Sequence, residues 1–66
     1  MKNGILREDE GFDILINGIP RTFRDLEATA YQAARYAKSR HPADIVEVRV
    51  RGTGVKVLML ADGRTA

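Results

Sequence analysis

Hydrophobic and polar positions change their spacing along this chain, and the change predicts strands on both sides of a helix. Residues 44–51 alternate between apolar and polar side chains, which is typical of a β-strand with one buried face. Residues 12–17 are also rich in β-branched and aliphatic side chains and end at Asn17-Gly18, a turn signal because both residues tolerate positive φ angles. From 23 to 37, apolar residues recur three or four positions apart, as on one face of a helix.

The helix is predicted to begin at Thr22 and to end at about Arg40. Thr22 is a good N-cap residue, and Asp25, three positions later, supplies the reciprocal carboxylate of a capping box. His41-Pro42 ends the helix because proline cannot continue it. The apolar face contains Phe23, Leu26, Ala30, Ala33, Ala34 and Ala37. Since most of these side chains are small, the helix can lie close to a sheet that supplies the larger residues.

Two interpretations of the N-terminal half remain open. In the first, residues 5–8 form a strand that pairs with 12–17 across a turn at 9–11. In the second, Asn17-Gly18 is a type I′ turn and residues 19–22 return as a short strand. Pro20 cannot donate a hydrogen bond to a ladder, so this return strand would lie at a sheet edge.

The C-terminal half predicts a second hairpin. Gly52-Thr53 fits a two-residue type II′ turn, with glycine at the first central position. That turn pairs Val48 with Val57, and Val46 with Met59, so that all four side chains share one face. Asp62-Gly63 then marks a turn, and the last three residues are expected to fray.

These elements predict a single domain, residues 1–66, of the α+β class. One helix packs on a largely antiparallel four-stranded sheet in the order β-β-α-β-β, which gives two layers. The order of the strands within the sheet stays open, because the helical crossover can bring the two hairpins together in more than one way.

The sheet face away from the helix is more apolar than a face exposed to water. Together with charged side chains, it is predicted to carry Ile5, Leu15, Ile45, Leu58 and Leu60. A contiguous patch of large aliphatic residues usually marks an interaction surface. We therefore expect these five residues to form the centre of a homodimer interface. The alternative is that another register, or the chain ends, covers them within one monomer.

Length and composition favour self-association. A chain of 66 residues buries only about 60% of its unfolded surface, so small domains often gain stability from disulfides, metals or association. The absence of cysteine excludes disulfides, and one histidine leaves few nitrogen ligands for a metal. No apolar run has the length of a signal peptide or membrane span. These features predict a soluble, cytoplasmic protein.

Positive charge is concentrated on the helical part of the chain and raises a second possible function. The net charge is +2, with −2 over residues 1–18 and +3 over residues 19–43. On a helical wheel, Arg24, Tyr31, Arg35 and Lys38 form one flank of the helix. Cations around an aromatic ring can hold phosphates and stack a base, so nucleic-acid binding is the alternative to protein–protein interaction. The simpler interpretation of this flank is a solvated helix face.

Other motifs predict structural roles. Residues 51–54 contain a lone Gly-x-Gly that is followed by a strand rather than the helix of a phosphate loop. His41 lies at the helix C-terminus without a placed catalytic partner, and residues 8–10 form an acidic turn. Catalysis needs groups within mutual reach, and the sequence indicates none. We therefore expect a protein without enzymatic activity, cofactor or metal.

The chain resembles small uncharacterised bacterial proteins with a β-β-α-β-β arrangement. The resemblance lies in residues 11–18, in the Ala-x-x-Ala-Ala helix at Ala30, Ala33 and Ala34, in residues 46–48 and in residues 62–64. Those families have no established activity, so the resemblance implies the fold and assigns no functional residue. A second similarity, in the order of strand, turn and Ala-rich helix, is to the HicB-type antitoxins. Those proteins usually have a Pro-Asp-rich segment before their helix. This chain lacks that segment and has only Gly18-Ile19-Pro20 in its place.

Overall fold

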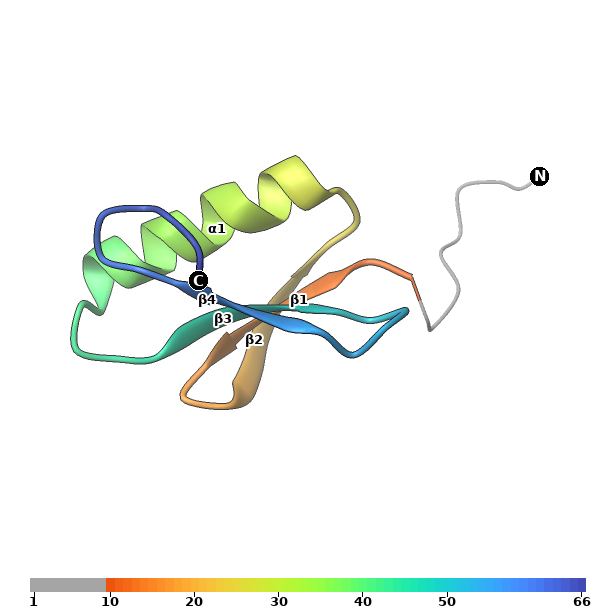
Figure 1. The fold of residues 1–66 in the computed structure, drawn as a ribbon, viewed down its shortest axis with the longest axis horizontal. Helices are drawn as coiled ribbons and strands as arrows, with labels where there is room; N and C mark the ends of the chain where they lie inside the picture. Colours follow the sequence, from red (N-terminus) through yellow and green to blue (C-terminus); the bar gives the residue numbers. More distant parts are fainter. Residues whose placement is uncertain (1–9) are drawn as a thin grey trace.

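The computed structural model describes residues 10–66, in which one helix packs on a four-stranded sheet. Figure 1 shows the helix lying across the sheet. The elements are β1 (Phe12–Ile16), β2 (Ile19–Arg24), α1 (Glu27–Arg40), β3 (Val46–Val50) and β4 (Lys56–Met59). The α+β class and the β-β-α-β-β order predicted from the sequence are confirmed.

The strand order is β2-β1-β3-β4, and every neighbouring pair is antiparallel. β1 and β3 are therefore the central strands, and the helical crossover joins the edge strand β2 to the central strand β3. This order, which the sequence left open, places the two most β-branched and aliphatic strands in the middle of the sheet.

The second interpretation of the N-terminal half is correct. Asn17 and Gly18 both have positive φ angles, 53° and 81°, as a type I′ hairpin requires. The return strand β2 pairs with one edge of β1, and β3 pairs with the other edge. The predicted hairpin between 5–8 and 12–17 is therefore wrong, because both edges of β1 are occupied; residues 5–8 lie outside the described part of the chain.

The helix begins later than predicted. Thr22 and Phe23 belong to β2, where they face Ile14 and Asp13 of β1. Leu26 occupies the N-cap position without a side-chain hydrogen bond, so the predicted capping box of Thr22 and Asp25 does not form. Pairing with β1 gives hydrogen-bond partners to the backbone groups of more residues than one additional turn of helix would. The predicted end is confirmed: α1 stops at Arg40, and the His41 amide donates to the carbonyl of Ala37.

Alanines bring α1 close to the sheet, as the sequence predicted. Ala30 and Ala34 are fully buried, and their small side chains leave room for larger ones beneath them. The core consists of Ile14, Ala30, Ala34, Val46, Val48 and Met59. Leu26 is 61% exposed and does not join this core, because the chain is still extended there.

The register of the C-terminal hairpin is confirmed, whereas its turn type is wrong. Val46 pairs with Met59 and Val48 with Val57, as predicted. The positive φ angle belongs to Gly54 (75°) and not to Gly52, and the Gly54 amide donates to the carbonyl of Val50 at 2.7 Å. The loop is thus longer than a type II′ turn, with the left-handed residue at its end.

The C-terminal residues do not fray. Leu58 and Ala66 exchange two backbone hydrogen bonds of 3.2 and 2.9 Å, and Leu60 donates to the carbonyl of Arg64. The predicted turn at Asp62-Gly63 is confirmed, since Gly63 has a φ angle of 88°. The end of the chain therefore folds back beside β4 and covers that edge of the sheet.

Candidate interaction surface on the sheet

The face of the sheet opposite α1, here called the outer sheet face, has no described helix across it (Figure 1). Residues alternate between the two faces of a strand, so the strand pairings place every second residue on the outer sheet face. From β1, β3 and β4 these residues are Asp13, Leu15, Glu47, Arg49, Lys56 and Leu58. Both charged and apolar side chains therefore share this face.

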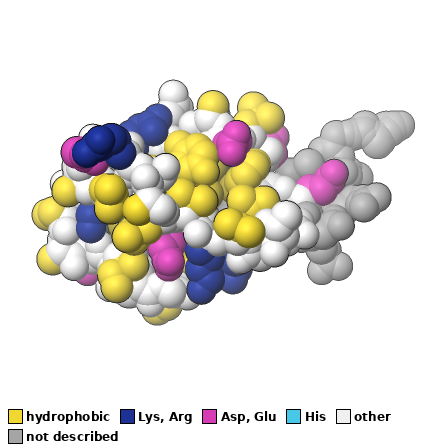
Figure 2. Space-filling view, in the orientation of Figure 1, with side chains coloured by type: hydrophobic (Ala, Val, Ile, Leu, Met, Phe, Trp, Pro, Cys, Tyr) yellow, Lys and Arg dark blue, Asp and Glu magenta, His cyan; other side chains and the backbone are white. Residues whose placement is uncertain are grey.

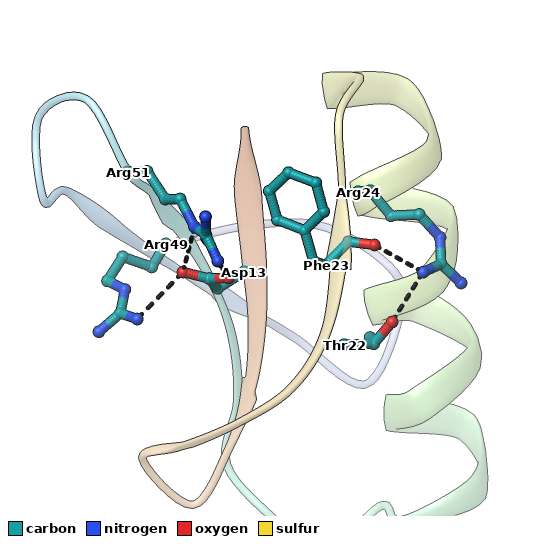
Figure 3. Close-up of polar contacts among 6 residues, drawn as sticks. All are labelled: Asp13, Thr22, Phe23, Arg24, Arg49 and Arg51. Carbon is teal, nitrogen blue, oxygen red and sulfur yellow. Dashed lines mark hydrogen bonds and ion pairs between the residues drawn. The ribbon is translucent and has the colours of Figure 1, made fainter. Parts of the chain in front are cut away.

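Asp13 is the centre of a charged cluster, here called the Asp13 cluster, that joins β1 to β3 and to the loop after β3. Its side chain is only 4% exposed. Arg51 donates three hydrogen bonds of 2.9 to 3.2 Å to the two carboxylate oxygens, and Arg49 Nη2 donates one of 3.0 Å to Oδ2. Figure 3 shows the two guanidinium groups converging on the carboxylate from the same side of the sheet.

The electrostatics of the Asp13 cluster favour an ionised carboxylate. The hydrogen bond from Arg51 is the main reason that the pKa of Asp13 lies below its ordinary value of 3.8; burial opposes this effect and Arg49 adds to it. The Arg51 guanidinium also lies 4.5 Å above the centre of the Phe23 ring, within the range of a cation–π interaction. The sequence shows that Arg49 and Arg51 alternate with apolar residues, but their approach to Asp13 depends on the pairing of β1 with β3, which the sequence left open.

The apolar residues predicted for the interface fall into different environments. Leu15 is 1% exposed and is enclosed within the monomer, so its assignment to the interface is wrong. Ile45 is 56% exposed, while Leu58 and Leu60 are half-buried. Ile5 lies outside the described residues. Ile45, Leu58 and Leu60 remain, and we call them the apolar strip.

Hydrogen bonds hold the apolar strip in position. The Asn17 amide donates to the carbonyl of Ile45, and the Ile45 amide donates to the side-chain oxygen of Asn17, at 2.8 and 2.9 Å. Leu58 is paired with Glu47 on one side and with Ala66 on the other. Exposed aliphatic side chains on a backbone fixed in this way form a preformed surface rather than a loose loop.

Both edges of the sheet are protected against pairing with another strand. Along β2, Pro20 lacks an amide hydrogen, and the pairing with β1 skips Arg21. On the other side, residues 64–66 cover part of the β4 edge. Proline, irregular pairing and coverage by the chain are common ways of preventing edge-to-edge association.

The predicted basic helix flank is not one surface. Because the helix starts at Glu27, Arg24 lies on β2, where its guanidinium donates to Thr22 Oγ1 and to the carbonyl of Phe23 (Figure 3). Lys38 donates to the carbonyl of Asp44 at 2.7 Å. Only Tyr31 and Arg35 stay together, in a groove beside the C-terminal residues. Figure 2 likewise shows the basic side chains of the visible face in separate groups.

His41 and residues 51–54 lie where the sequence placed them, at the end of the helix and between two strands, whereas residues 8 and 9 of the predicted acidic turn lie outside the described residues. His41 lies 3.7 Å from the Asp44 carboxylate, with both side chains partly exposed to solvent. Residues 51–54 form the loop between β3 and β4. Within residues 10–66, no three His, Cys, Asp or Glu side chains are grouped as a metal site requires. No helix in this range is long and apolar enough to cross a membrane.

Comparisons with known proteins give no relative: no family model, no curated protein and no solved structure matches the chain.

Proposed function

We propose that the protein is a non-enzymatic interaction module that forms a homodimer through its outer sheet face. The observation that supports this most directly is Ile45, an aliphatic side chain that is 56% exposed although hydrogen bonds to Asn17 fix its backbone. With Leu58 and Leu60 it forms the centre of the proposed interface. Burial of these side chains against a second copy would remove apolar surface from water.

The small core gives the monomer a reason to associate. Seven hydrophobic residues in the described part of the chain are buried, and two of them are alanine. On the outer sheet face, Asp13 and Leu15 are already buried among the described residues, whereas the apolar strip can contribute further stability when a partner covers it. Two such sheets packed face to face would form a four-layer dimer, with helices outside and sheets inside.

The protected edges favour face-to-face contact over strand pairing. Pro20 and the irregular pairing at Arg21 interrupt one edge, and residues 64–66 cover the other. If two copies paired through the edges of their sheets, these interruptions would break the ladder of backbone hydrogen bonds between them. Within residues 10–66, no comparable obstacle lies on the outer sheet face.

Charges on the outer sheet face can complement those of a second copy. Arg49, Lys56 and Arg51 lie toward one end of the face, and Glu47 lies beside the apolar strip. In a two-fold symmetric dimer the same surface of both protomers forms the interface. Each ion pair between the protomers therefore occurs twice. We propose that Glu47 of each protomer approaches Lys56 of its partner, because Glu47 and Lys56 have no ion-pair partner among residues 10–66.

Sedimentation equilibrium over a wide range of concentrations tests the dimer. The wild-type protein is expected to sediment as a dimer, and Ile45→Glu is expected to shift it to a monomer. Ile19→Glu is the matched control, because Ile19 is also exposed, at 54%. It pairs with Ile16 and therefore lies on the face of the sheet toward α1, outside the proposed interface. A wild-type monomer at all concentrations, or equal effects of the two substitutions, would contradict the proposal.

A charge exchange tests the proposed pairing within that dimer. Glu47→Lys and Lys56→Glu, each alone, place like charges opposite each other and are expected to weaken dimerisation by about tenfold or more. The double variant restores opposite charges and is expected to dimerise like the wild type. A double variant that is as weak as the two single variants would exclude this pairing, while leaving the outer sheet face testable through Ile45→Glu.

A further inference from the structure

A groove lies between α1 and the C-terminal residues. Its volume is about 680 Å³, within the range of small-molecule sites. Residues from both sides line it: Glu27, Ala28, Tyr31, Gln32 and Arg35 from the helix, and Gly63, Arg64 and Thr65 from the chain end. We call it the helix groove. It lies on the helix side of the sheet and is therefore separate from the outer sheet face.

Two arginines, Arg35 and Arg64, line the helix groove. Among residues 10–66, Arg35 has no hydrogen-bond or ion-pair partner. The Arg64 Nε donates to Asp62 Oδ2 at 2.8 Å, which orients the side chain and leaves its two terminal nitrogens without a partner in this part of the chain. Two arginines that line one groove and have unused donors are suited to a phosphate or another oxyanion.

Gly63 fixes the approach of Arg35 to the chain end. A Cβ atom on Gly63 would lie 3.2 Å from Arg35 Cδ, tighter than most contacts of a real Cβ. The φ angle of 88° at Gly63 is a second reason for glycine at this position. The stem of Arg35 therefore lies against the turn, and Arg35 lines the groove.

The other groups of the helix groove are arranged along one side of the helix. Glu27, Tyr31 and Arg35 follow one another at intervals of four residues, so they lie on the same face about 6 Å apart along the axis. Along the helix, a carboxylate, an aromatic ring and the guanidinium of Arg35 thus follow one another, and Arg64 lines the groove from the chain end. Tyr31 is half-buried against the core, which fixes the position of its ring.

We infer that the helix groove binds a nucleotide, with the phosphate at Arg35 and Arg64 and the planar base beside Tyr31. The carboxylate of Glu27 and the amide of Gln32 can accept hydrogen bonds from amino groups of the base. Along the groove, the anion-binding group corresponds to the phosphate of a nucleotide. The aromatic ring and the hydrogen-bond acceptors that follow correspond to the face and the edge of its base. The nucleotide is either free or part of a single strand, since both present the same groups.

Amide chemical shifts of the full-length ¹⁵N-labelled protein test this inference, with adenosine monophosphate, adenosine and inorganic phosphate as separate probes. Adenosine monophosphate is expected to give saturable shifts at Gln32, Gly63 and Thr65, and the two partial probes to bind about tenfold or more weakly. Arg35→Ala is expected to weaken binding by about tenfold. Arg21→Ala is the matched control, because Arg21 is an exposed arginine outside this groove.

Fluorescence anisotropy with a labelled single-stranded oligoadenylate of about ten nucleotides distinguishes the two sources of the nucleotide. Binding of the strand with loss of affinity between about 50 and 200 mM salt, and weak binding of the mononucleotide, would assign the groove to single strands. The inference is wrong when neither probe saturates, when inorganic phosphate binds as tightly as adenosine monophosphate, or when Arg35→Ala and Arg21→Ala weaken binding equally.

Discussion

Replacing Asp13 with asparagine tests whether the Asp13 cluster stabilises the fold. The substitution keeps the size of the side chain and removes the negative charge that Arg49 and Arg51 share. It also places amide hydrogens where one carboxylate oxygen accepted hydrogen bonds. Two guanidinium groups would then face each other across a neutral side chain that is almost completely buried.

The expected cost follows from the burial of the three partners. Removing one partner of a fully buried ion pair costs about 3–5 kcal/mol, whereas an exposed pair contributes about 0–1 kcal/mol. Asp13 is buried, but the side chains of Arg49 and Arg51 are 37% and 36% exposed, so water can solvate them after the substitution. We therefore expect Asp13→Asn to lower the free energy of unfolding by about 2 kcal/mol, between these limits.

Urea denaturation followed by circular dichroism measures this difference, with Asp62→Asn as control. The midpoint of Asp13→Asn should fall while the slope of the transition stays constant. Asp62 also has a lowered pKa, chiefly because the Arg64 amide donates to it, but its ion pair with Arg64 is solvent-exposed. Asp62→Asn is expected to leave the midpoint unchanged. An unchanged midpoint for Asp13→Asn would refute the stabilising role of the Asp13 cluster.

The contribution of Asp13 to the free energy of unfolding is expected to fall as the pH is lowered. The pKa of Asp13 is lower in the folded protein than its ordinary value of 3.8, so folding favours the ionised form. The stabilisation is complete above about pH 5 and is lost as the pH falls through 3.8 toward the lower folded value. The difference between wild type and Asp13→Asn should therefore shrink below pH 3.8. A difference that grows on acidification would contradict this account.

Three further substitutions test other parts of the fold by the free energy of unfolding. Thr22→Ala should change it by less than about 0.5 kcal/mol, since Thr22 lies in β2 and caps no helix; a loss above 1 kcal/mol would support the capping box instead. Gly11→Ala should cost about 2 kcal/mol or more, because Gly11 has a φ angle of 95° and a Cβ there would overlap the Phe23 ring; an unchanged value would mean that the turn adapts freely. Ala34→Leu should cost about 1–3 kcal/mol by forcing α1 away from the sheet, and a stabilised variant would indicate a loosely packed contact.

The C-terminal hairpin could be predicted from the sequence because its signals are local and agree with one another. The alternation of apolar and polar residues from Val46 to Arg51 defined one face, and the positions of Gly52 and Gly54 limited the loop to a few lengths. A two-residue loop at 52–53 and the observed loop at 51–54 both pair Val48 with Val57. The exact turn could not be predicted, because either glycine can take the positive φ angle and the choice depends on the twist of the strands.

The start of the helix could not be predicted, because Thr22 and Asp25 are consistent with two structures. As a local motif they form a capping box, which contributes about 1 kcal/mol. As part of a hairpin closed by Asn17-Gly18, residues 22–24 belong to β2, of which five residues pair with β1. Several backbone hydrogen bonds and cross-strand contacts outweigh a single cap. The decisive information is therefore the pairing with β1, which is not contained in residues 22–25 themselves.

The burial of residues on the outer sheet face could not be predicted either, because it depends on contacts between residues that are distant in the sequence. The sequence correctly placed Leu15, Ile45 and Leu58 on one face by their alternation, but alternation does not predict how deeply each side chain is enclosed. Leu15 lies in a central strand with neighbours on both sides, whereas Ile45 precedes β3 and has fewer neighbours. The same central position buries Asp13, and burial is possible there only because two arginines pair with it. The strand order, which places β1 between β2 and β3, thus explains both the buried leucine and the buried carboxylate.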